Sequence, residues 1–491
     1  MSESSGADES LAQRLVRARA ACLNDMEVYF LDDPCTLRAP LNPRNEAASL
    51  SILLEDQAKK STEGEGISEE VMECLHNYEQ MIDSSTAICG VKSFGKDSAE
   101  GELRKWCLDK GASMSLCPAT FTSSSGGLVR GLMAENDLEP GECVISIKED
   151  MLISTQTATT SDLGMALDAM GVKDDGQKAV IWTMVDRVDK DSEHTPFWGA
   201  LPNNIESGLS YDDEDLEMLK GTPAFDELKC AKEHIRESYA AIVDLLNALV
   251  ATYPEDLTSE QFSWESYLWA TQLWYAYAME VEFLDGEIRS CLVPYATLMN
   301  HSIYPHVVQY GKIDLATKSL RLRNFRRCKR AEECFLSYGP LPNIKLLVYY
   351  GFAIRSNPYD VLEIDLPDVD IRDRRHKMQE EIIQELGIGK SHFVRAGPIP
   401  QKLLCFAMVS VAEITELQII RKTGQVSIQK SLEKRALEML LTVLKNQKCP
   451  APLRKTDGKS RREFIEVYRE GCQHILDCSL KDVLHRIDGC K

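Results

Sequence analysis

The stretch LMNHSIYPH, Leu298 to His306, contains an asparagine next to a histidine and a second histidine five residues later. These residue types support three interpretations. The histidines could be metal ligands, Asn300 and His301 could grip a small molecule, or Asn-His-Ser beside a proline could form an ordinary turn. Neither histidine has a cysteine or carboxylate at the usual ligand spacing, which disfavours zinc. We therefore expect no metal, and these residue types alone leave the ligand-binding turn and the ordinary turn open.

A second set of candidate residues is aromatic and follows the turn along the chain: Phe335, Tyr338, Tyr349, Tyr350 and Phe352. Such rings can line an apolar channel, and tyrosine hydroxyls can form hydrogen bonds from the wall of that channel. A glycine directly follows Tyr338, which permits close approach of the backbone to a ligand. The same rings could instead be core packing, and for any single one of them that alternative stays open.

The elements that must position these residues fall into blocks of different pattern. Residues 126–154 predict two strands joined as a β-hairpin by an Asn-Asp-Leu-Glu-Pro-Gly turn, and short strands return between 288 and 366. Helical patterns occupy about 155–280 and the chain beyond Pro367. In one of these helices Trp264, Leu268 and Tyr275 fall near one face, which indicates a core stripe. This order predicts an α+β domain over 101–366, an all-helical domain over 367–491 and an acidic helical extension over 1–100.

Composition limits the partners and the compartment. The formal net charge of −21 argues against wrapping nucleic acid and is compatible with a basic protein substrate. No apolar run is long enough to suggest a membrane span. The sixteen cysteines contain no C-x-x-C pair, and the acidic N-terminus lacks the features of a leader. We expect a monomer in the cytoplasm or nucleus, with the chloroplast left open.

Several segments in order resemble the SET-domain methyltransferases of the Rubisco large-subunit lysine methyltransferase type, and the related actin-histidine branch. These segments are LRKWCLDKGAS, RGLMAENDLEPGECVISI, PFWGALP followed by LSYDDEDLEMLKGT, LVPYATLMNHS, FLSYGPLPNIKLLVYYGF and NPYDVLEIDL. The resemblance covers about 102–366, and the tail is similar in size and character to the family's substrate-binding domain. It implies a SET fold whose small sheets contain a knot-like crossing, interrupted by a helical insert.

The resemblance also implies an activity and roles for individual residues. The chain would be an S-adenosylmethionine-dependent protein methyltransferase that binds its protein substrate through the helical tail. Asn300 and His301 would hold the two ends of the cofactor, and Tyr338 would be catalytic and touch the cofactor. The remaining implied residues would contact the cofactor (Arg130, Gly131, Leu132 and Tyr350) or line the substrate channel (Tyr310, Phe335 and Phe352).

Three positions depart from the family pattern. Tyr277 stands where an arginine usually contacts the cofactor carboxylate, Thr297 replaces an aspartate, and Leu128 or an adjacent glycine replaces an acidic residue. A missing charge-assisted hydrogen bond weakens binding by about 1.5–3 kcal/mol unless another group compensates. The alternative hypothesis is therefore a peptide-binding module with weak or no catalysis. Ala296 replaces a bulky aromatic residue of the actin-histidine branch, which favours lysine over histidine as the acceptor.

Overall fold

The computed structural model describes residues 10–31, 37–60, 68–82, 90–122, 127–308, 311–364, 366, 374–389, 391–426, 429–447 and 460–489. The chain divides into two compact units, each described here by itself. The first unit comprises Met1–Cys22, Leu37–Ser210 and Lys229–Pro340. The second comprises Leu23–Thr36, Tyr211–Leu228 and Leu341–Lys491.

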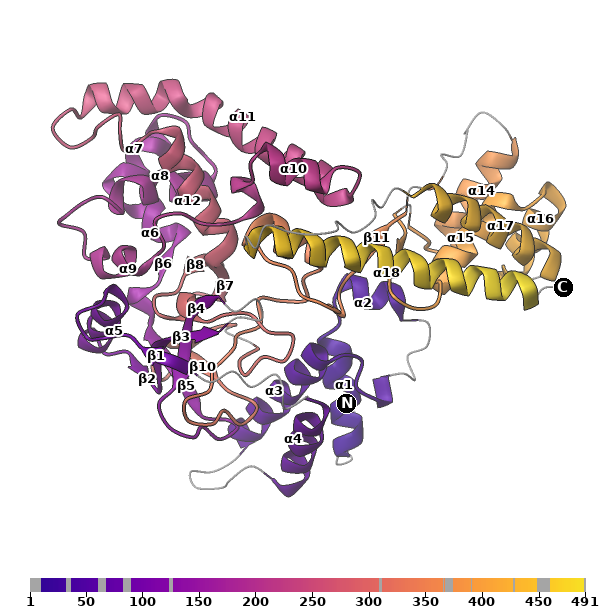
Figure 1. Ribbon diagram of the computed structural model, residues 1–491, viewed down its shortest axis with the longest axis horizontal. Coiled ribbons are helices and arrows are strands. Elements are labelled where there is room, and N and C mark those ends of the chain that lie inside the picture. Colours follow the sequence, from indigo (N-terminus) through magenta and orange to yellow (C-terminus); the bar gives the residue numbers. More distant parts are fainter. Residues whose placement is uncertain are drawn as a thin grey trace, which may run out of the picture. The chain divides into compact units, whose positions relative to one another are not determined.

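Three small sheets form the framework of the first unit (Figure 1). One has the order β1-β3-β4, with β1 Gly90–Ser93, β3 Leu116–Thr122 and β4 Leu128–Ala134. The second has the order β2-β5-β10-β9, with β2 Ser113–Met114, β5 Cys143–Lys148, β10 Ser319–Arg323 and β9 Ile313–Asp314. The third has the order β6-β8-β7, with β6 Ile153–Ser154, β8 Ile288–Leu292 and β7 Ala278–Glu282. Two of the sheets therefore join strands from both sequence blocks.

The hairpin predicted within residues 126–154 is wrong, although its two strands exist. β4 pairs with the preceding strand β3 over its whole length, from Leu116↔Ala134 to Thr122↔Leu128. β5 instead pairs with β2 and β10 in a different sheet. The turn chemistry identified a change of direction correctly, but turn residues do not determine which strand supplies the hydrogen bonds of the next one.

The predicted helical insert lies between β6 and β7. Its helices in the first unit are α6 (Thr155–Thr160), α7 (Asp162–Ala169), α8 (Asp175–Asp186), α9 (Thr195–Ala200) and α12 (Trp264–Tyr277). α11 (Pro223–Thr252) also belongs to the insert, and its first six residues fall in the second unit. Side-chain caps start two of the helices, since Asp174 accepts a hydrogen bond from the Gln177 N–H and Ser263 accepts one from the Ser266 N–H.

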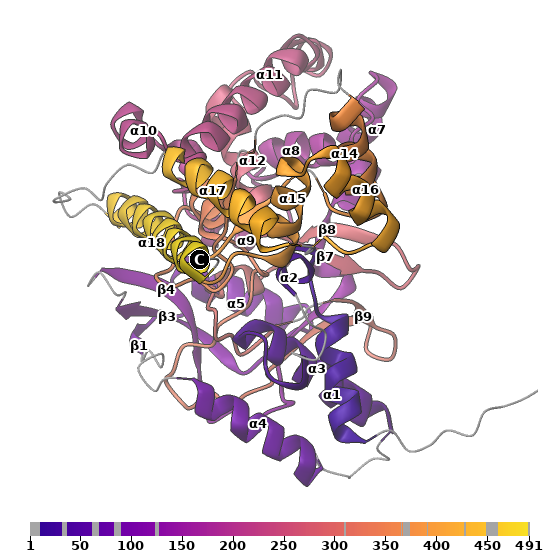
Figure 2. The same ribbon diagram turned by 90° about the vertical axis from the view of Figure 1, so that its right-hand side faces the viewer.

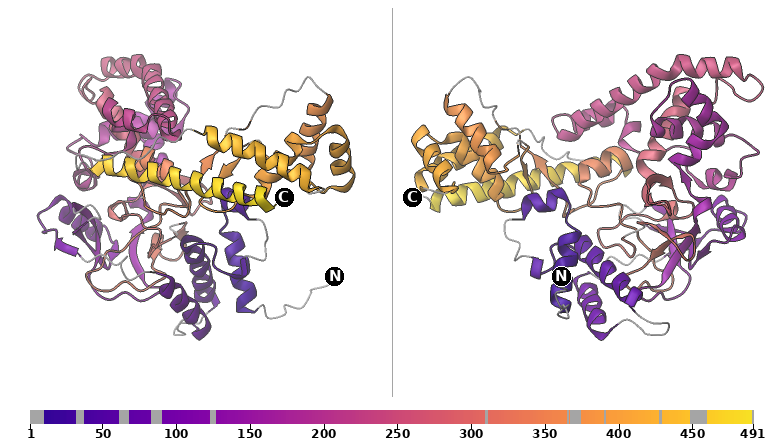
Figure 3. Two further views of the ribbon diagram at one scale, coloured as in Figure 1. Left: turned by 45° about the vertical axis from the view of Figure 1, so that its right-hand side comes forward. Right: turned by 180° about the vertical axis from the view of Figure 1, so that it is seen from behind.

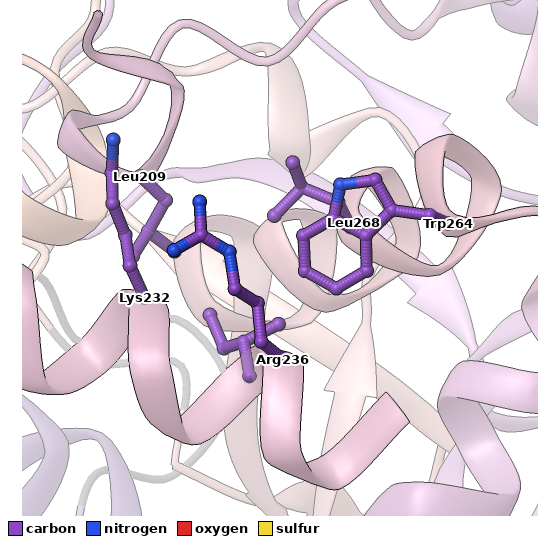
Figure 4. Close-up of a pocket in the computed structure, with 6 residues that line it drawn as sticks. Leu209, Lys232, Arg236, Trp264 and Leu268 are labelled. Carbon is purple, nitrogen blue, oxygen red and sulfur yellow. The ribbon is translucent and has the colours of Figure 1, made fainter. Parts of the chain in front are cut away.

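The core stripe predicted on α12 is wrong in its details. Tyr275 is 43% exposed, and the buried residues of the helix include Tyr267 and Trp269. Trp264 and Leu268 line a pocket instead (Figure 4). Figure 4 shows the side chains of Lys232 and Arg236 on one side of it and the Trp264 indole on the other. Helical spacing identified the shared face, but α11 covers that face only in part.

Helices from the N-terminal part of the chain pack in the first unit, among them α1 (Leu11–Ala21), α3 (Pro43–Lys60) and α4 (Glu69–Met81). One buried cluster joins apolar residues of α3 and α4, Ala47, Ala48, Leu50, Leu53, Val71, Leu75 and Tyr78, to Val308 and Phe325. The Tyr78 and Phe325 rings meet edge to face, with centroids 5.5 Å apart. The N-terminal helices therefore share a core with the segment that follows the Asn-His turn. Then α5 (Ala99–Asp109) follows, and Gly111 after it has a φ of +85°.

We expect Tyr78→Phe to stabilise the protein. The Tyr78 side chain is 1% exposed, and its hydroxyl has no hydrogen-bond partner among the described residues. A buried polar group without a partner costs about 1–3 kcal/mol. Its removal should therefore raise the free energy of unfolding by about 1 kcal/mol, which should be measured as a slightly higher melting temperature. Leu75→Ala in the same cluster is the contrasting variant and should cost about 2–5 kcal/mol. A lower melting temperature for Tyr78→Phe would show that the hydroxyl has a partner after all.

The second unit is mainly helical, as the tail pattern predicts. α15 (Gln401–Val411) packs against α17 (Lys430–Asn446), which in turn packs against α18 (Ser460–Gly489), a long helix coloured yellow in Figures 2 and 3. The other helices are α2 (Asp25–Phe30), α10 (Asp213–Leu219), α13 (Asn343–Lys345), η6 (Leu346–Tyr350), α14 (Arg374–Glu385) and α16 (Ile414–Thr423). One two-stranded ribbon, β11 (Leu362–Glu363) with β12 (Phe393–Val394), joins the tail to the preceding segment. Within the described ranges, no helix has the length and apolarity needed to cross a membrane.

Candidate functional site

Two distant segments of the first unit cross at the candidate site. Leu336 forms parallel bridges with both His301 and Val307, so the loop over residues 300–307 passes on two sides of one strand-like segment. The Leu336 N–H donates to the Asn300 carbonyl at 2.9 Å, and the Ser337 N–H donates to the Val307 carbonyl, also at 2.9 Å. The crossing that the resemblance implies is therefore present, and it brings the Asn-His turn and Tyr338 together.

The Asn300 amide is held against β4, the strand that contains the expected cofactor-binding residues Arg130 to Leu132. We call it the cofactor strand. Its Nδ2 donates to the Arg130 carbonyl and to Glu333 Oε1, each at 2.7 Å. A backbone carbonyl can only accept a hydrogen bond, which fixes the orientation of the amide. Both amide protons are used, so Asn300 can meet a ligand only through Oδ1, as an acceptor.

Gly131 provides the close approach on which this contact depends. A Cβ at this position would lie 2.3 Å from Glu333 Oε1, 2.9 Å from Asn300 Nδ2 and 3.0 Å from Phe121. The next residue, Leu132, is fully buried, and its carbonyl accepts a hydrogen bond from the Cys334 N–H at 2.8 Å. Arg130, Gly131 and Leu132 therefore lie against both segments of the crossing.

Glu333 is a residue of the site that the sequence did not reveal. Its side chain is 3% exposed, and Asn300 is its hydrogen-bond partner. Burial raises the pKa of the Glu333 carboxyl to about 7, and the Asn300 hydrogen bond opposes that rise. The adjacent Glu332 accepts from the Lys329 N–H instead. A period of two in the surrounding sequence would have predicted which of Glu332 and Glu333 is buried, because neighbouring side chains of a strand point to opposite faces. The residues around them show no clear period.

His301 and Tyr338 form one rigid pair. Their rings stack with centroids 5.1 Å apart and planes inclined by 27°. The Tyr338 N–H donates to His301 Nδ1 at 3.1 Å, and the Tyr338 hydroxyl donates to the Met299 carbonyl at 2.7 Å. Burial lowers the pKa of His301 to about 4, a shift opposed by a hydrogen bond with the Leu336 backbone and assisted by Arg44. The imidazole is therefore neutral at pH 7.

An arginine charge lies near Tyr277, the position where the resemblance expects one. Burial raises the pKa of the Tyr277 phenol, and the nearby Arg130 guanidinium opposes that rise. Arg130 also forms an ion pair with Glu100 at 3.2 Å and hydrogen-bonds the Ala200 carbonyl. At Thr297, where the family pattern has an aspartate, the hydroxyl is buried without a hydrogen-bond partner in the described part of the chain.

The structure brings Cys328 and Cys334 to His306, a convergence that sequence spacing could not show. One ring nitrogen of His306 and the two sulfur atoms lie within 4.8 Å of one another, and all three residues are buried. However, His306 Nδ1 faces the Phe335 N–H at 3.0 Å and the Arg326 guanidinium at 3.3 Å. Both are donors, so Nδ1 accepts and Nε2 carries the proton. In this tautomer neither nitrogen offers a lone pair to a metal ion.

The remaining predicted site residues do not all lie at the crossing. Phe335 is 8% exposed and stacks on His306, with ring centroids 6.1 Å apart. Tyr310 lies outside the described residues. Tyr350 and Phe352 belong to the second unit, where their rings meet edge to face at 6.3 Å on either side of Gly351, which has a φ of +81°. The channel roles of Tyr310, Phe335 and Phe352, and the cofactor role of Tyr350, stay predictions.

The residues present fit the S-adenosylmethionine site that the resemblance implies. The cofactor carries a donor, its ammonium group, and Asn300 presents only an acceptor to a ligand. The absence of a side chain on Gly131 lets the Asn300 amide and the Glu333 carboxyl lie against the backbone of this strand, which places Asn300 beside it. The carboxyl of Glu333 is buried directly behind Asn300 and accepts a hydrogen bond from its amide, so it lies close to the atom that would meet a ligand.

Comparisons with curated proteins support the resemblance over part of the chain. No family model matches. The chain is 31% identical over 270 residues to SET domain-containing protein 4 of Homo sapiens, covering 52% of this chain and 59% of that protein. It is 24% identical over 331 residues to the actin-histidine N-methyltransferase of Xenopus tropicalis, covering 65% of this chain and 54% of that protein. The chain thus spans less than two thirds of the length of these relatives.

Solved structures confirm the fold. The SET domain of LSMT bound to lysine and AdoHcy superposes with a TM-score of 0.65 at 16% identity, covering 80% of this chain and 92% of that one. Rubisco LSMT bound to AdoMet gives a TM-score of 0.62 at 16% identity, with 80% and 93% covered. The chain therefore has the α+β fold of the LSMT SET domain with its helical insert and helical tail.

Proposed function

We propose that this chain is an S-adenosylmethionine-dependent protein methyltransferase. The observation that carries the proposal is the crossing, where Asn300, His301 and Tyr338 meet the Arg130 to Leu132 strand in a SET fold. The relatives and the solved structures named above support it. When bound, the cofactor supplies an electrophilic methyl group on a sulfonium ion. The chain has to orient the acceptor, exclude water and accommodate its proton loss.

Tyr338 is the residue we assign to orienting the acceptor amine. Its hydroxyl proton is donated to the Met299 carbonyl, so toward an amine N–H the oxygen can act only as an acceptor. The stacked, neutral His301 fixes the ring without adding positive charge. A lysine amine has a reference pKa of about 10.4 and must lose a proton before it attacks. The site is partly buried, and desolvation there lowers the pKa of the amine and so favours loss of its proton.

We propose lysine as the acceptor and a protein segment bound by the helical second unit as the substrate. The lysine-bound LSMT structure favours lysine, while the actin-histidine relative favours histidine. Ala296 is fully buried in η5 (Ala296–Leu298), shortly before Asn300, and its small side chain in place of a bulky aromatic one is the feature of this chain that supports lysine. The helices α15, α17 and α18 pack on one another and give the second unit a scaffold for such binding.

The proposal is tested by incubating the full chain with methyl-labelled S-adenosylmethionine and a proteome extract. We expect label in protein, and amino-acid analysis of hydrolysed product to give methyl-lysine. Methyl-histidine would correct the acceptor and leave the methyltransferase assignment intact. Cofactor binding without any transfer would favour the alternative, a peptide-binding module that kept the fold.

A further inference from the structure

Glu333 is a buried acid that the proposed chemistry does not use. It lies directly behind the Asn300 amide, and its Oε1 occupies the space that a side chain on Gly131 would fill. The Met133↔Glu333 bridge fixes its backbone beside the cofactor strand. A buried acid held this firmly at a ligand site is a functional candidate rather than an accident of packing.

We propose, resting on the proposed function, that Glu333 is a positioning residue whose carboxylate becomes the counter-charge of the cofactor ammonium group and acts through Asn300. The acceptor Oδ1 of Asn300 is the atom that the ammonium meets. The charge of Glu333 lies one hydrogen bond behind it, because Glu333 Oε1 takes a proton of the same amide. The sulfonium has no N–H or O–H donor. Asn300 Oδ1 and the Glu333 carboxylate are both acceptors, so they match the ammonium group and not the methyl-bearing end of the cofactor.

The protonation state of Glu333 follows from its surroundings. The groups close to its carboxyl are the Asn300 amide, the Gly131 backbone and the Phe121 ring, whereas the Cys328 thiol donates to the backbone carbonyl of Glu333. The Cys334 thiol has a pKa well above its ordinary value, chiefly through its hydrogen bond with Cys328 and burial. Burial holds the Glu333 carboxyl at a pKa of about 7, although the Asn300 hydrogen bond opposes that rise. An ammonium about 4–6 Å away lowers a carboxyl pKa by about 1–3 units.

Cofactor binding near neutral pH should therefore release a proton. The sign follows from linkage: the cofactor prefers the ionised form, so its affinity rises with pH and levels off above the free pKa of about 7. Below that pH the dissociation constant should change by up to about tenfold per unit. The cofactor's own amine, with a reference pKa of about 7.7–8.0, stays mostly protonated in that range.

The test is calorimetric binding to the full chain between about pH 5.5 and 7, in two buffers of different ionisation enthalpy. S-adenosylmethionine and S-adenosylhomocysteine both carry the ammonium and should release up to one proton. 5′-Methylthioadenosine lacks it and should release none. Glu333→Gln keeps the shape and a hydrogen-bond acceptor but should bind both ammonium ligands more weakly at pH 7, with no proton release. Glu332→Gln is the matched control and should behave as the unchanged protein.

The variants also separate Glu333 from Asp360 of the second unit, whose carboxyl pKa is likewise raised by burial to about 7. Proton release that persists in Glu333→Gln would overturn the inference, as would pH-independent binding by the unchanged protein. Neither result would affect the proposed activity. Failure of S-adenosylmethionine to bind at any pH would instead remove the proposed function, and this inference with it.

Discussion

Replacing Tyr338 by phenylalanine should lower methyl transfer by about 10- to 150-fold while leaving cofactor affinity nearly unchanged. The hydroxyl is the only part removed, and it makes a 2.7 Å hydrogen bond to the Met299 carbonyl. With its proton fixed there, the oxygen is oriented to accept from the substrate amine. A hydrogen bond involving a charged group contributes about 1.5–3 kcal/mol, and each 1.36 kcal/mol is a factor of ten in rate.

The phenylalanine variant should keep its ring on His301, because the stacking uses the ring face and the Tyr338 N–H bond to Nδ1 is unaffected. Single-turnover transfer and calorimetric binding of S-adenosylhomocysteine measure the two effects separately. Tyr253→Phe, on an exposed tyrosine of the helical insert, is the control for general loss of a phenol. If Tyr338→Phe transferred methyl groups at the unchanged rate, the hydroxyl would have no part in the reaction.

Gly131→Ala should sharply weaken cofactor binding and destabilise the first unit. The new Cβ would lie 2.3 Å from Glu333 Oε1 and 2.9 Å from Asn300 Nδ2. β4 cannot move away freely, because Gly131 is paired with Ala119 in the middle of an antiparallel ladder. Overpacking of this kind costs about 1–3 kcal/mol. The side chains that must give way are those that hold the ligand, so we expect at least about tenfold weaker binding of S-adenosylhomocysteine.

The control for this variant is Gly199→Ala in α9. A Cβ there meets no atom within 4 Å, and alanine is favoured over glycine in helices by about 1 kcal/mol. That variant should retain cofactor affinity and melt at the same temperature or slightly higher. Equal binding by Gly131→Ala and the unchanged protein would mean that the cofactor does not depend on the contact between β4 and Asn300.

Part of the site could be predicted from sequence because short segments of this chain resemble a known family, and the resemblance implied the roles of their residues. Asn300 and His301 are adjacent, Tyr338 precedes a glycine, and Arg130 to Leu132 occupy one strand. Residue type restricts what such positions do, since an amide, an imidazole and a phenol each offer a fixed set of hydrogen bonds. The strands and helices were predicted from periodicity within single segments.

The remaining features depended on contacts between segments far apart in the chain. The β4 and β5 strands were recognised, yet their partners β3, β2 and β10 are decided by which ladders form in three dimensions. Trp264 and Leu268 share a helix face, but that face is a core only where another element covers it, and here it lines an open pocket. His306 acquires two thiols from a segment more than twenty residues later.

The sequence by itself determined the α+β class and the order of the elements, because local patterns are properties of short segments, and its resemblance to the SET-domain methyltransferases implied which residues meet at the crossing. Only the tertiary structure decided that Glu333 is buried behind Asn300 while Glu332 is turned away. The physical reason is that burial, hydrogen-bond partner and pKa belong to the space around a side chain. The residues that surround a side chain come from segments that are far apart along the chain.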